Sequence, residues 1–204
     1  MGTLGGNKLT RIVFATKNSG KLGEIKEMLA GLNVILLSLN DFPNIPEIEE
    51  DGSSYLENAL KKARAVSDFT GEMALADDSG LEVDALGGAP GIHSSRYAGD
   101  EAMDEDNMRK LLKELEGLPP DKRGATFHCE MVFYLPGGAY EAFRGRWNGR
   151  IHDVPLGDGG FGYDPVFFLL DRGVTVGQLP ADVKNRISHR AQAFAAFRER
   201  LQKF

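Results

Sequence analysis

Apolar and polar positions alternate along the chain in blocks whose lengths and periods predict strands and helices in turn. The β-branched and aromatic residues at 11–15 predict a first strand, and the apolar run at 34–37 predicts a second. Between them, apolar residues recur at helical spacing over 22–32, and Gly31 marks the helix end. The first part of the chain therefore predicts a strand–helix–strand unit.

The next block begins with a loop. Residues 40–52 are acidic and contain two prolines, which favours a surface loop. Ser54 and Glu57 fit a capping box, in which a Ser or Thr is followed three residues later by Glu. We expect the helix that they open to run to about Thr70, with an apolar face.

A short apolar run at 73–76 then meets Asp77, Asp78, Ser79 and Gly80. We expect a strand covered on both faces to end here, with Gly80 permitting a sharp turn beside Ser79. Because neighbouring side chains of a strand point to opposite faces, Asp77 and Asp78 should serve different partners. One should face the chemistry, and the other should hold the backbone or a neighbouring loop. The alternative is an ordinary turn at a strand end.

The second half of the chain has a different pattern. It predicts a helix, a long β-hairpin and a terminal helix, at residues 104–115, at 126–134 joined to 140–147, and from about Ser188 to Phe204. Helix-flanked strands together with a long hairpin predict an α/β fold with a mixed, twisted sheet flanked by helices. We expect a flexible tail at residues 1–8 and a single domain over residues 9–204.

Composition narrows the class of protein. With 204 residues, 42% hydrophobic and 26% charged, the chain can bury the core of one globular domain. The net charge of −6 disfavours a nucleic-acid duplex as the main partner, and no apolar stretch reaches membrane-spanning length. The lone Cys129 lies in an apolar run and is expected in the core, so we expect a cytoplasmic protein.

The junction between the first strand and the first helix is rich in hydrogen-bond donors. A helix N-terminus offers unpaired N–H groups and a positive dipole end to an anion, and Lys21 would add a charge over a phosphate. A P-loop is disfavoured, because Ala15 and Leu22 occupy positions where that motif needs Gly and Ser or Thr. A polar helix cap with a solvated lysine is the alternative.

Three further features of the sequence have two interpretations each. Glu57 is explained by capping, but it could instead help Asp78 to hold Mg²⁺, which prefers a few carboxylates together with substrate phosphates. Phe161 stands between two glycines, where its ring could stack on a planar base or could fill the core beneath a loop. The polar run at 184–190 is either a solvated face or, through His189, a set of donors for a base carbonyl.

Taken together, these segments resemble the inosine/xanthosine triphosphate pyrophosphatase family. The matching stretches occur in the family's order and span nearly the whole chain, at 16–21, 57–59, 76–81, 87–91, 161–164 and 188–190. Each stretch is short, and the combination of all six is specific.

The resemblance implies two lobes with a central substrate cleft, a homodimer, and Mg²⁺-dependent hydrolysis of ITP, dITP and XTP to the monophosphate and pyrophosphate. By position, Asp78 matches the family's catalytic proton acceptor and metal ligand, and Glu57 is our choice for the second metal ligand. The positions that match substrate contacts are Thr16, Lys17, Asn18, Ser19, Gly20, Lys21, Ser79, Phe161, Gly162, Tyr163, Asp164, Lys184, His189 and Arg190.

Two other functions fit the same segments. One is a pyrophosphatase of related fold that acts on pyrimidine or modified-base triphosphates. The other is a nucleotide-binding sensor without catalysis. Mg²⁺-dependent release of pyrophosphate across a panel of nucleotides would discriminate among the three.

Overall fold

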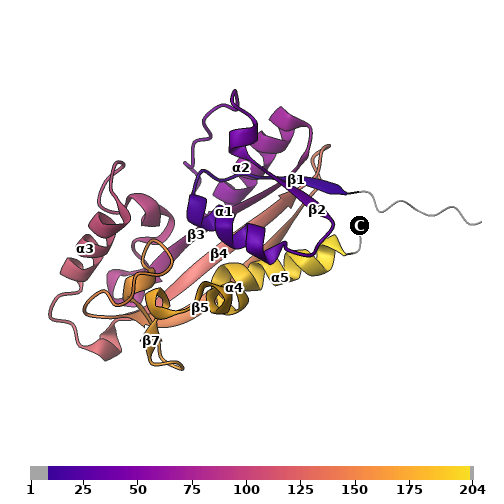
Figure 1. Cartoon of the computed structure of the whole chain (residues 1–204). Coiled ribbons are helices and arrows are strands. Elements are labelled where there is room, and N and C mark those ends of the chain that lie inside the picture. The colour runs from indigo at the N-terminus through magenta and orange to yellow at the C-terminus, as the bar shows by residue number, and fades with distance from the viewer. Residues whose placement is uncertain (1–8, 203–204) are drawn as a thin grey trace, which may run out of the picture.

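The computed structural model describes residues 9–202, and its strands form one sheet of seven (Figure 1). The strands are β1 Thr10–Phe14, β2 Val34–Ser38, β3 Met73–Val83, β4 Gly124–Tyr134, β5 Tyr140–Ile151, β6 Phe167–Leu169 and β7 Val174–Thr175. The helices are α1 Ser19–Met28, α2 Tyr55–Thr70, α3 Asp104–Glu114, α4 Ala181–Ile187 and α5 His189–Leu201. The expected tail at residues 1–8 and the predicted helix end at Phe204 lie outside the described residues.

The sheet has the order β2-β1-β3-β4-β5-β6-β7 and is mixed, as the sequence predicts. Strand β1 pairs in parallel with both β2 and β3, and α1 provides the crossover from β1 to β2. All the later pairings are antiparallel, beginning with the long β3–β4 and β4–β5 ladders. The predicted hairpin is therefore the centre of the sheet.

Helices cover both faces of the β1–β3–β4 region. Ile12 and Phe14 pack with α1 and α5 on one face, whereas Val13 and Ala15 pack with α2 on the other. This is the period-2 alternation of a strand that is buried on both sides. In Figure 1, α5 lies along the long hairpin, and α3 lies at the end of the sheet far from β1 and β2.

The buried apolar residues confirm two lobes. One lobe contains the two clusters around β1. The other contains a cluster in which Leu111 of α3 and Leu115, which directly follows that helix, meet Leu81 and Val83 of β3. Strands β3, β4 and β5 contribute to the cores at both ends, so they connect the lobes as one continuous ribbon (Figure 1).

The prediction that the central strand ends at its acidic residues is wrong. Strand β3 continues through Asp77 and Asp78, and its antiparallel register with β4 runs on to Val83. Gly80 makes no turn. It lies inside the strand, and the position requires glycine because a Cβ there would be 2.4 Å from the carbonyl oxygen of Gly91. The glycine serves a close packing contact with a segment remote in sequence, which a local pattern does not reveal.

One edge of β3 is left without a neighbouring strand in the middle of its length. The pairing with β1 stops at Leu75, and farther along the N–H of Leu81 is bonded to the side chain of Ser94. Between these points, residues 76–80 have a strand neighbour only on the β4 side, within the part of the chain described. Side chains from both faces of β3 can reach this open edge, and the candidate site lies there.

Candidate functional site

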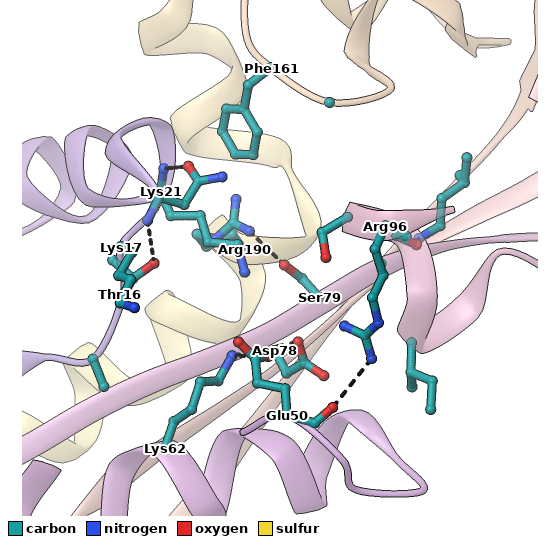
Figure 2. A pocket seen from close by; sticks show the side chains of 18 of the residues that line it. Thr16, Lys17, Lys21, Glu50, Lys62, Asp78, Ser79, Arg96, Phe161 and Arg190 are labelled. Carbon is teal, nitrogen blue, oxygen red and sulfur yellow. Dashed lines mark hydrogen bonds and ion pairs between the residues drawn. The ribbon is translucent and has the colours of Figure 1, made fainter. Parts of the chain in front are cut away.

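A cavity of about 360 Å³ opens at the free edge of β3, between the two lobes (Figure 2). Among the described residues, the cationic side chains that line it are Lys17, Lys21, Lys62, Arg96, Lys184 and Arg190. Carboxylates line it as well, from Glu47, Glu50, Asp78, Asp104 and Asp164. The cavity therefore holds cationic and anionic groups side by side, several of them in ion pairs, although the whole chain is acidic.

The predicted phosphate-binding junction forms the N-terminus of α1. Asn18 caps the helix, with its Oδ1 accepting the N–H of Lys21 at 2.9 Å, and Oγ1 of Thr16 accepts the N–H of Asn18 at 3.1 Å. Ser19 and Gly20 follow in the first turn, whose N–H groups have no intrahelical acceptor. Thr16, Asn18 and Lys21 line the cavity, whereas Ser19 and Gly20 are not among its lining residues. The helix dipole adds to the attraction for an anion.

Asp78 lies on the α2 side of β3, in a polar group of buried side chains. Nδ2 of Asn58 donates to its Oδ2 at 3.1 Å, and Nζ of Lys62 lies 3.6 Å from its Oδ1. The same ammonium group contacts Oε2 of Glu50 at 2.7 Å and donates to the carbonyl of Asp77 at 2.8 Å. Burial raises the pKa of the Asp78 carboxyl, against the opposing effects of Lys62 and Lys21. The carboxylate is thus held at the cavity wall and disposed to take up a proton.

Asp77 lies on the opposite face and is fully enclosed. Its Oδ2 accepts from Nε and Nη2 of Arg190 at 3.1 and 3.0 Å, and Nζ of Lys21 lies 3.1 Å away. Burial would raise the pKa of Asp77, but Lys21 and Arg190 outweigh it, and the net pKa is lowered. Arg190 also donates from Nη2 to the hydroxyl of Ser79 at 2.8 Å. Asp77 is therefore an ionised anchor that joins β3 to α1 and α5.

This anchor continues into a buried network of ion pairs. Glu24 of α1 accepts from Nη1 of Arg190 at 2.5 Å, and its other oxygen lies 2.6 Å from Nζ of Lys184 in α4. Lys184 in turn contacts Asp164 at 2.5 Å. Buried charges persist only when they are paired and hydrogen-bonded, and here acids and bases alternate along the network. The network fixes α1, α4, α5 and the loop before β6 relative to one another.

The predicted nucleotide-binding loop, residues 161–164, is held by that network. Asp164 accepts the N–H of Phe161 at 2.9 Å while it pairs with Lys184, so it shapes the loop from within. The Phe161 ring packs on α1, where a Cβ on Gly20 would come within 2.5 Å of it, and Nζ of Lys184 lies 4.3 Å from its centroid. The ring is partly exposed and lines the cavity, as Figure 2 shows. It is thus a wall of the cavity and not a plug of the core.

The other two residues of the loop are fixed from the second lobe. The N–H of Gly162 donates to Asp104 at the start of α3, at 2.6 Å. Tyr163 is buried, and its hydroxyl donates to the carbonyl of Ser94 at 2.9 Å. Both residues line the cavity, but these polar groups are directed to the protein.

His189 lies at the start of α5, in an aromatic enclosure. Its ring stacks on Phe127, with centroids 4.8 Å apart, and lies tilted beside Trp147. Burial, reinforced by the charges of Arg190 and Lys184, lowers the pKa of the imidazole well below its ordinary value. The ring is therefore neutral at pH 7, with one donor and one acceptor nitrogen. Its Nδ1 is buried without a hydrogen-bond partner among residues 9–202, which leaves Nε2 as the nitrogen available to a ligand in the cavity.

The structure does not bring Glu57 to Asp78. The hydrogen bonds of its carboxylate are local. One carboxylate oxygen accepts from the N–H and from the hydroxyl of Ser53, at 2.8 and 2.7 Å. The hydroxyl of Ser54 accepts the N–H of Glu57, so Ser54 is the N-cap of α2 as predicted. The carboxylate of Glu57 bonds to Ser53 and not to the N–H of Ser54, so the reciprocal half of the predicted capping box is not formed. Glu57 is not among the residues that line the cavity, and its assignment as a metal ligand is corrected. Glu50, in the loop before α2, lines the cavity instead.

The sequence analysis missed several charged residues, among them Lys62 at the cavity wall and Glu24 in the buried ion-pair network. Lys62 lies three residues after Ala59 and four before Val66, on the apolar face of α2, and Glu24 directly precedes the buried Ile25. A charge on the apolar side of a helix costs free energy unless it is paired, so this placement was the signal that could have revealed both residues.

The donor set at Asp78 fits a Mg²⁺ ion that is bound together with a substrate. Asp78 and Glu50 both contact the ammonium of Lys62, so the two carboxylates lie near each other on the cavity wall. No group of three or more His, Cys, Asp or Glu side chains that could hold a metal occurs in residues 9–202. Mg²⁺ typically uses one or two carboxylates, with phosphate and water oxygens completing its shell.

Known proteins are similar to this chain in sequence and in fold. The model of the Ham1 family matches residues 12–200. A dITP/XTP pyrophosphatase of Geobacter sulfurreducens is 52% identical over 95% of this chain and 97% of its own length, and that of Geobacillus kaustophilus is 47% identical over 94% of both. Among solved structures, a HAM1 protein from Coxiella burnetii has a TM-score of 0.86 and 41% identity, covering 96% of this chain and all of its own.

Proposed function

This chain belongs to the Ham1 family, and we infer that it hydrolyses non-standard purine nucleoside triphosphates, namely ITP, dITP and XTP, to the monophosphate and pyrophosphate. The observation that carries this function is the buried Asp78 carboxylate at a cavity wall, beside the N-terminus of α1 and among cationic side chains. Such an enzyme removes deaminated purines from the nucleotide pool.

The triphosphate would bind where α1 begins. Phosphoryl transfer depends on positioning and on charge neutralisation more than on covalent catalysis. The dipole of α1 at its N-terminus and the ammonium groups of Lys21 and Lys62 supply fixed positive charge at that end of the cavity. Lys21 and Lys62 are already oriented by Asp77 and Asp78, so little side-chain freedom is lost on binding.

Asp78 is our candidate for the general base. A water molecule attacks the triphosphate, its proton passes to the Asp78 carboxylate, and pyrophosphate or the monophosphate departs with the bridging oxygen. The raised pKa of Asp78 brings its basicity closer to that of a useful proton acceptor. Asn58 keeps the carboxylate oriented through the bond to its Oδ2.

We further propose that Mg²⁺ binds at Asp78 and Glu50. The ion would neutralise charge on the phosphate oxygens. Glu50 replaces Glu57 in this role because its carboxylate, and not that of Glu57, lines the cavity.

The base would lie at the opposite end, near Phe161 and His189. Stacking of a base on an aromatic ring is worth about 1–3 kcal/mol and tolerates any base, so it does not discriminate among purines. Discrimination needs hydrogen bonds. Hypoxanthine and xanthine present a 6-keto oxygen to an N–H donor such as His189, whereas the 6-amino group of adenine would leave such a donor unpaired.

A nucleotide panel tests the function. Purified protein with Mg²⁺ is assayed for pyrophosphate release from dITP, XTP, dATP, dGTP, dCTP and dUTP. We expect kcat/KM to be highest for dITP and XTP. Preference for a pyrimidine triphosphate would contradict the purine specificity, and binding of dITP without pyrophosphate release would contradict catalysis.

Two properties expected from the sequence also belong to this proposal. We propose a homodimer, which light scattering after size exclusion would test, and a cytoplasmic location. No helix in residues 9–202 is long and apolar enough to cross a membrane.

A further inference from the structure

Ser94 connects the two functional parts of the cavity. It lies in the 3₁₀ helix Gly91–Arg96 and is buried. Its Oγ accepts the N–H of Leu81 in β3 at 2.9 Å and donates to the carbonyl of Gly91 at 2.6 Å. Its own carbonyl accepts the hydroxyl of Tyr163 at 2.9 Å. One residue thus bonds both to the strand that carries Asp78 and to the loop that carries Phe161.

A second feature of the chain serves the same contact. Gly80 occupies a strand interior, where a glycine costs stability and contributes no packing. A Cβ there would lie 2.7 Å from Oγ of Ser94 and 2.4 Å from the carbonyl oxygen of Gly91. The missing side chain lets the 3₁₀ helix approach the strand closely enough for Ser94 to bond to it. The glycine in the strand and the serine in the 3₁₀ helix therefore depend on each other for this contact.

The position of Tyr163 is consistent with this role. Its ring belongs to the apolar cluster of the second lobe, and its hydroxyl is directed to Ser94. Tyr163 therefore holds the loop, and Phe161, two residues earlier, lines the cavity.

We propose that Ser94 is a positioning residue that, through Leu81 and Tyr163, fixes the base-binding loop relative to the Asp78 carboxylate. The inference rests on the proposed function and deepens it. A purine stacked on Phe161 then places its triphosphate at the correct distance from Asp78. A base that shifts the loop moves the triphosphate away from that position. Selectivity for the base is in this way expressed in the rate of phosphate hydrolysis and not only in binding.

The test uses Tyr163→Phe, Ser94→Ala and the double variant. Tyr163→Phe keeps the buried ring and removes only the hydroxyl, so it should fold. Because misplacement of reacting groups by about 1 Å can cost about 100-fold in rate, we expect kcat for dITP to fall by about tenfold or more in each single variant. The ratio of kcat/KM for dITP to that for dATP should fall several-fold, while the melting temperature changes little in Tyr163→Phe.

The double variant and a matched control distinguish a shared connection from separate effects. If both residues act through one connection, the double variant should lose no more selectivity than the worse single variant. Tyr97→Phe removes the same group from a tyrosine of the same lobe whose hydroxyl bonds to Glu114, and it should leave the selectivity ratio unchanged.

Two different failures can be told apart. If the wild-type protein releases no pyrophosphate from dITP, the proposed function is wrong. If the wild type is active but Tyr163→Phe keeps its kcat and its selectivity ratio, or if the losses of the two single variants multiply in the double variant, the role of Ser94 is wrong. Should Ser94→Ala fail to fold, Tyr163→Phe alone decides.

Discussion

Asp77 and Asp78 are consecutive residues of β3, yet their carboxylates lie on opposite faces of the strand and contact different cations. Asp77 is bonded to Arg190 at 3.0 Å, and Asp78 lies 3.6 Å from Lys62. Asp77 holds α5 and α1 against the sheet, and Asp78 lines the cavity. Asp78 thus lies directly on the cavity wall, whereas Asp77 acts on the cavity only through Lys21 and Arg190, which line it.

Asp78→Asn should abolish turnover and leave the fold intact. The amide keeps the shape of the side chain and can still bond to Asn58, but it cannot accept a proton and binds Mg²⁺ poorly. General base catalysis contributes about 10²–10⁴-fold, so kcat for dITP should fall by at least about 10²-fold. Pyrophosphate release and the melting temperature are measured together. Activity within a few-fold of wild type would refute the assignment.

Asp77→Asn should instead destabilise the protein. It leaves the buried guanidinium of Arg190 with only part of its counter-charge, and breaking a buried ion pair typically costs about 3–5 kcal/mol. Urea denaturation should show a loss of about 3 kcal/mol in the free energy of unfolding.

Asp68→Asn is the matched control for that experiment. The same chemical change is made at a residue whose pair with Arg64 is solvent-exposed, with a separation of 3.5 Å. An exposed pair contributes about 0–1 kcal/mol, so little change is expected. Equal losses in the two variants would mean that the Asp77 network does not anchor the fold.

Glu50→Gln should raise the Mg²⁺ concentration needed for half-maximal activity, by about tenfold, because one of two proposed carboxylate ligands is neutralised. Glu57→Gln is the matched control. It makes the same chemical change in the first turn of α2, at a carboxylate that bonds to Ser53, and should leave the Mg²⁺ requirement unchanged. Titration of pyrophosphate release with Mg²⁺ measures both. A shift in Glu57→Gln and none in Glu50→Gln would restore the assignment made from the sequence.

The sequence predicted the elements whose signals are local. The strand at 11–15, the α2 helix with its N-cap at Ser54 and the long hairpin all depend on period and on neighbouring residues, and the structure contains each of them. The signals for the polar N-terminus of α1 at Asn18 and for the N-cap of α2 at Ser54 are equally local.

The features that the sequence did not yield depend on partners remote in the chain. Gly80 resembles a turn residue until the approach of Gly91 is known, and α4 is a short helix whose Lys184 is fixed by Glu24, 160 residues away in sequence. Glu50 was one of several acids in a loop, and only the path of that loop brings its carboxylate to Lys62. Local pattern identifies elements, whereas the pairing of charges across elements requires the fold.

The neutral state of His189 makes stability depend on pH. Burial, followed by the charges of Arg190 and Lys184, lowers the pKa of this imidazole well below 6.5, the value for a free side chain. Below pH 6.5 the unfolded chain therefore binds a proton at His189 that the folded protein does not. Since stability rises with pH wherever the unfolded state holds more protons, this contribution is complete above pH 6.5 and is lost as the pH falls.

Replacement of His189 should remove that dependence. Between pH 6 and pH 5 the wild type should lose up to about 1.4 kcal/mol per pH unit through this residue, and His189→Gln should have a flatter profile by that amount. Urea denaturation of both proteins at several pH values measures the slopes, so a uniform loss of stability in the variant does not affect the comparison. Parallel profiles would show that His189 is protonated in the folded protein. In that case both ring nitrogens would carry protons, Nε2 could act only as a donor to the base, and the basis of purine selectivity would have to be sought there.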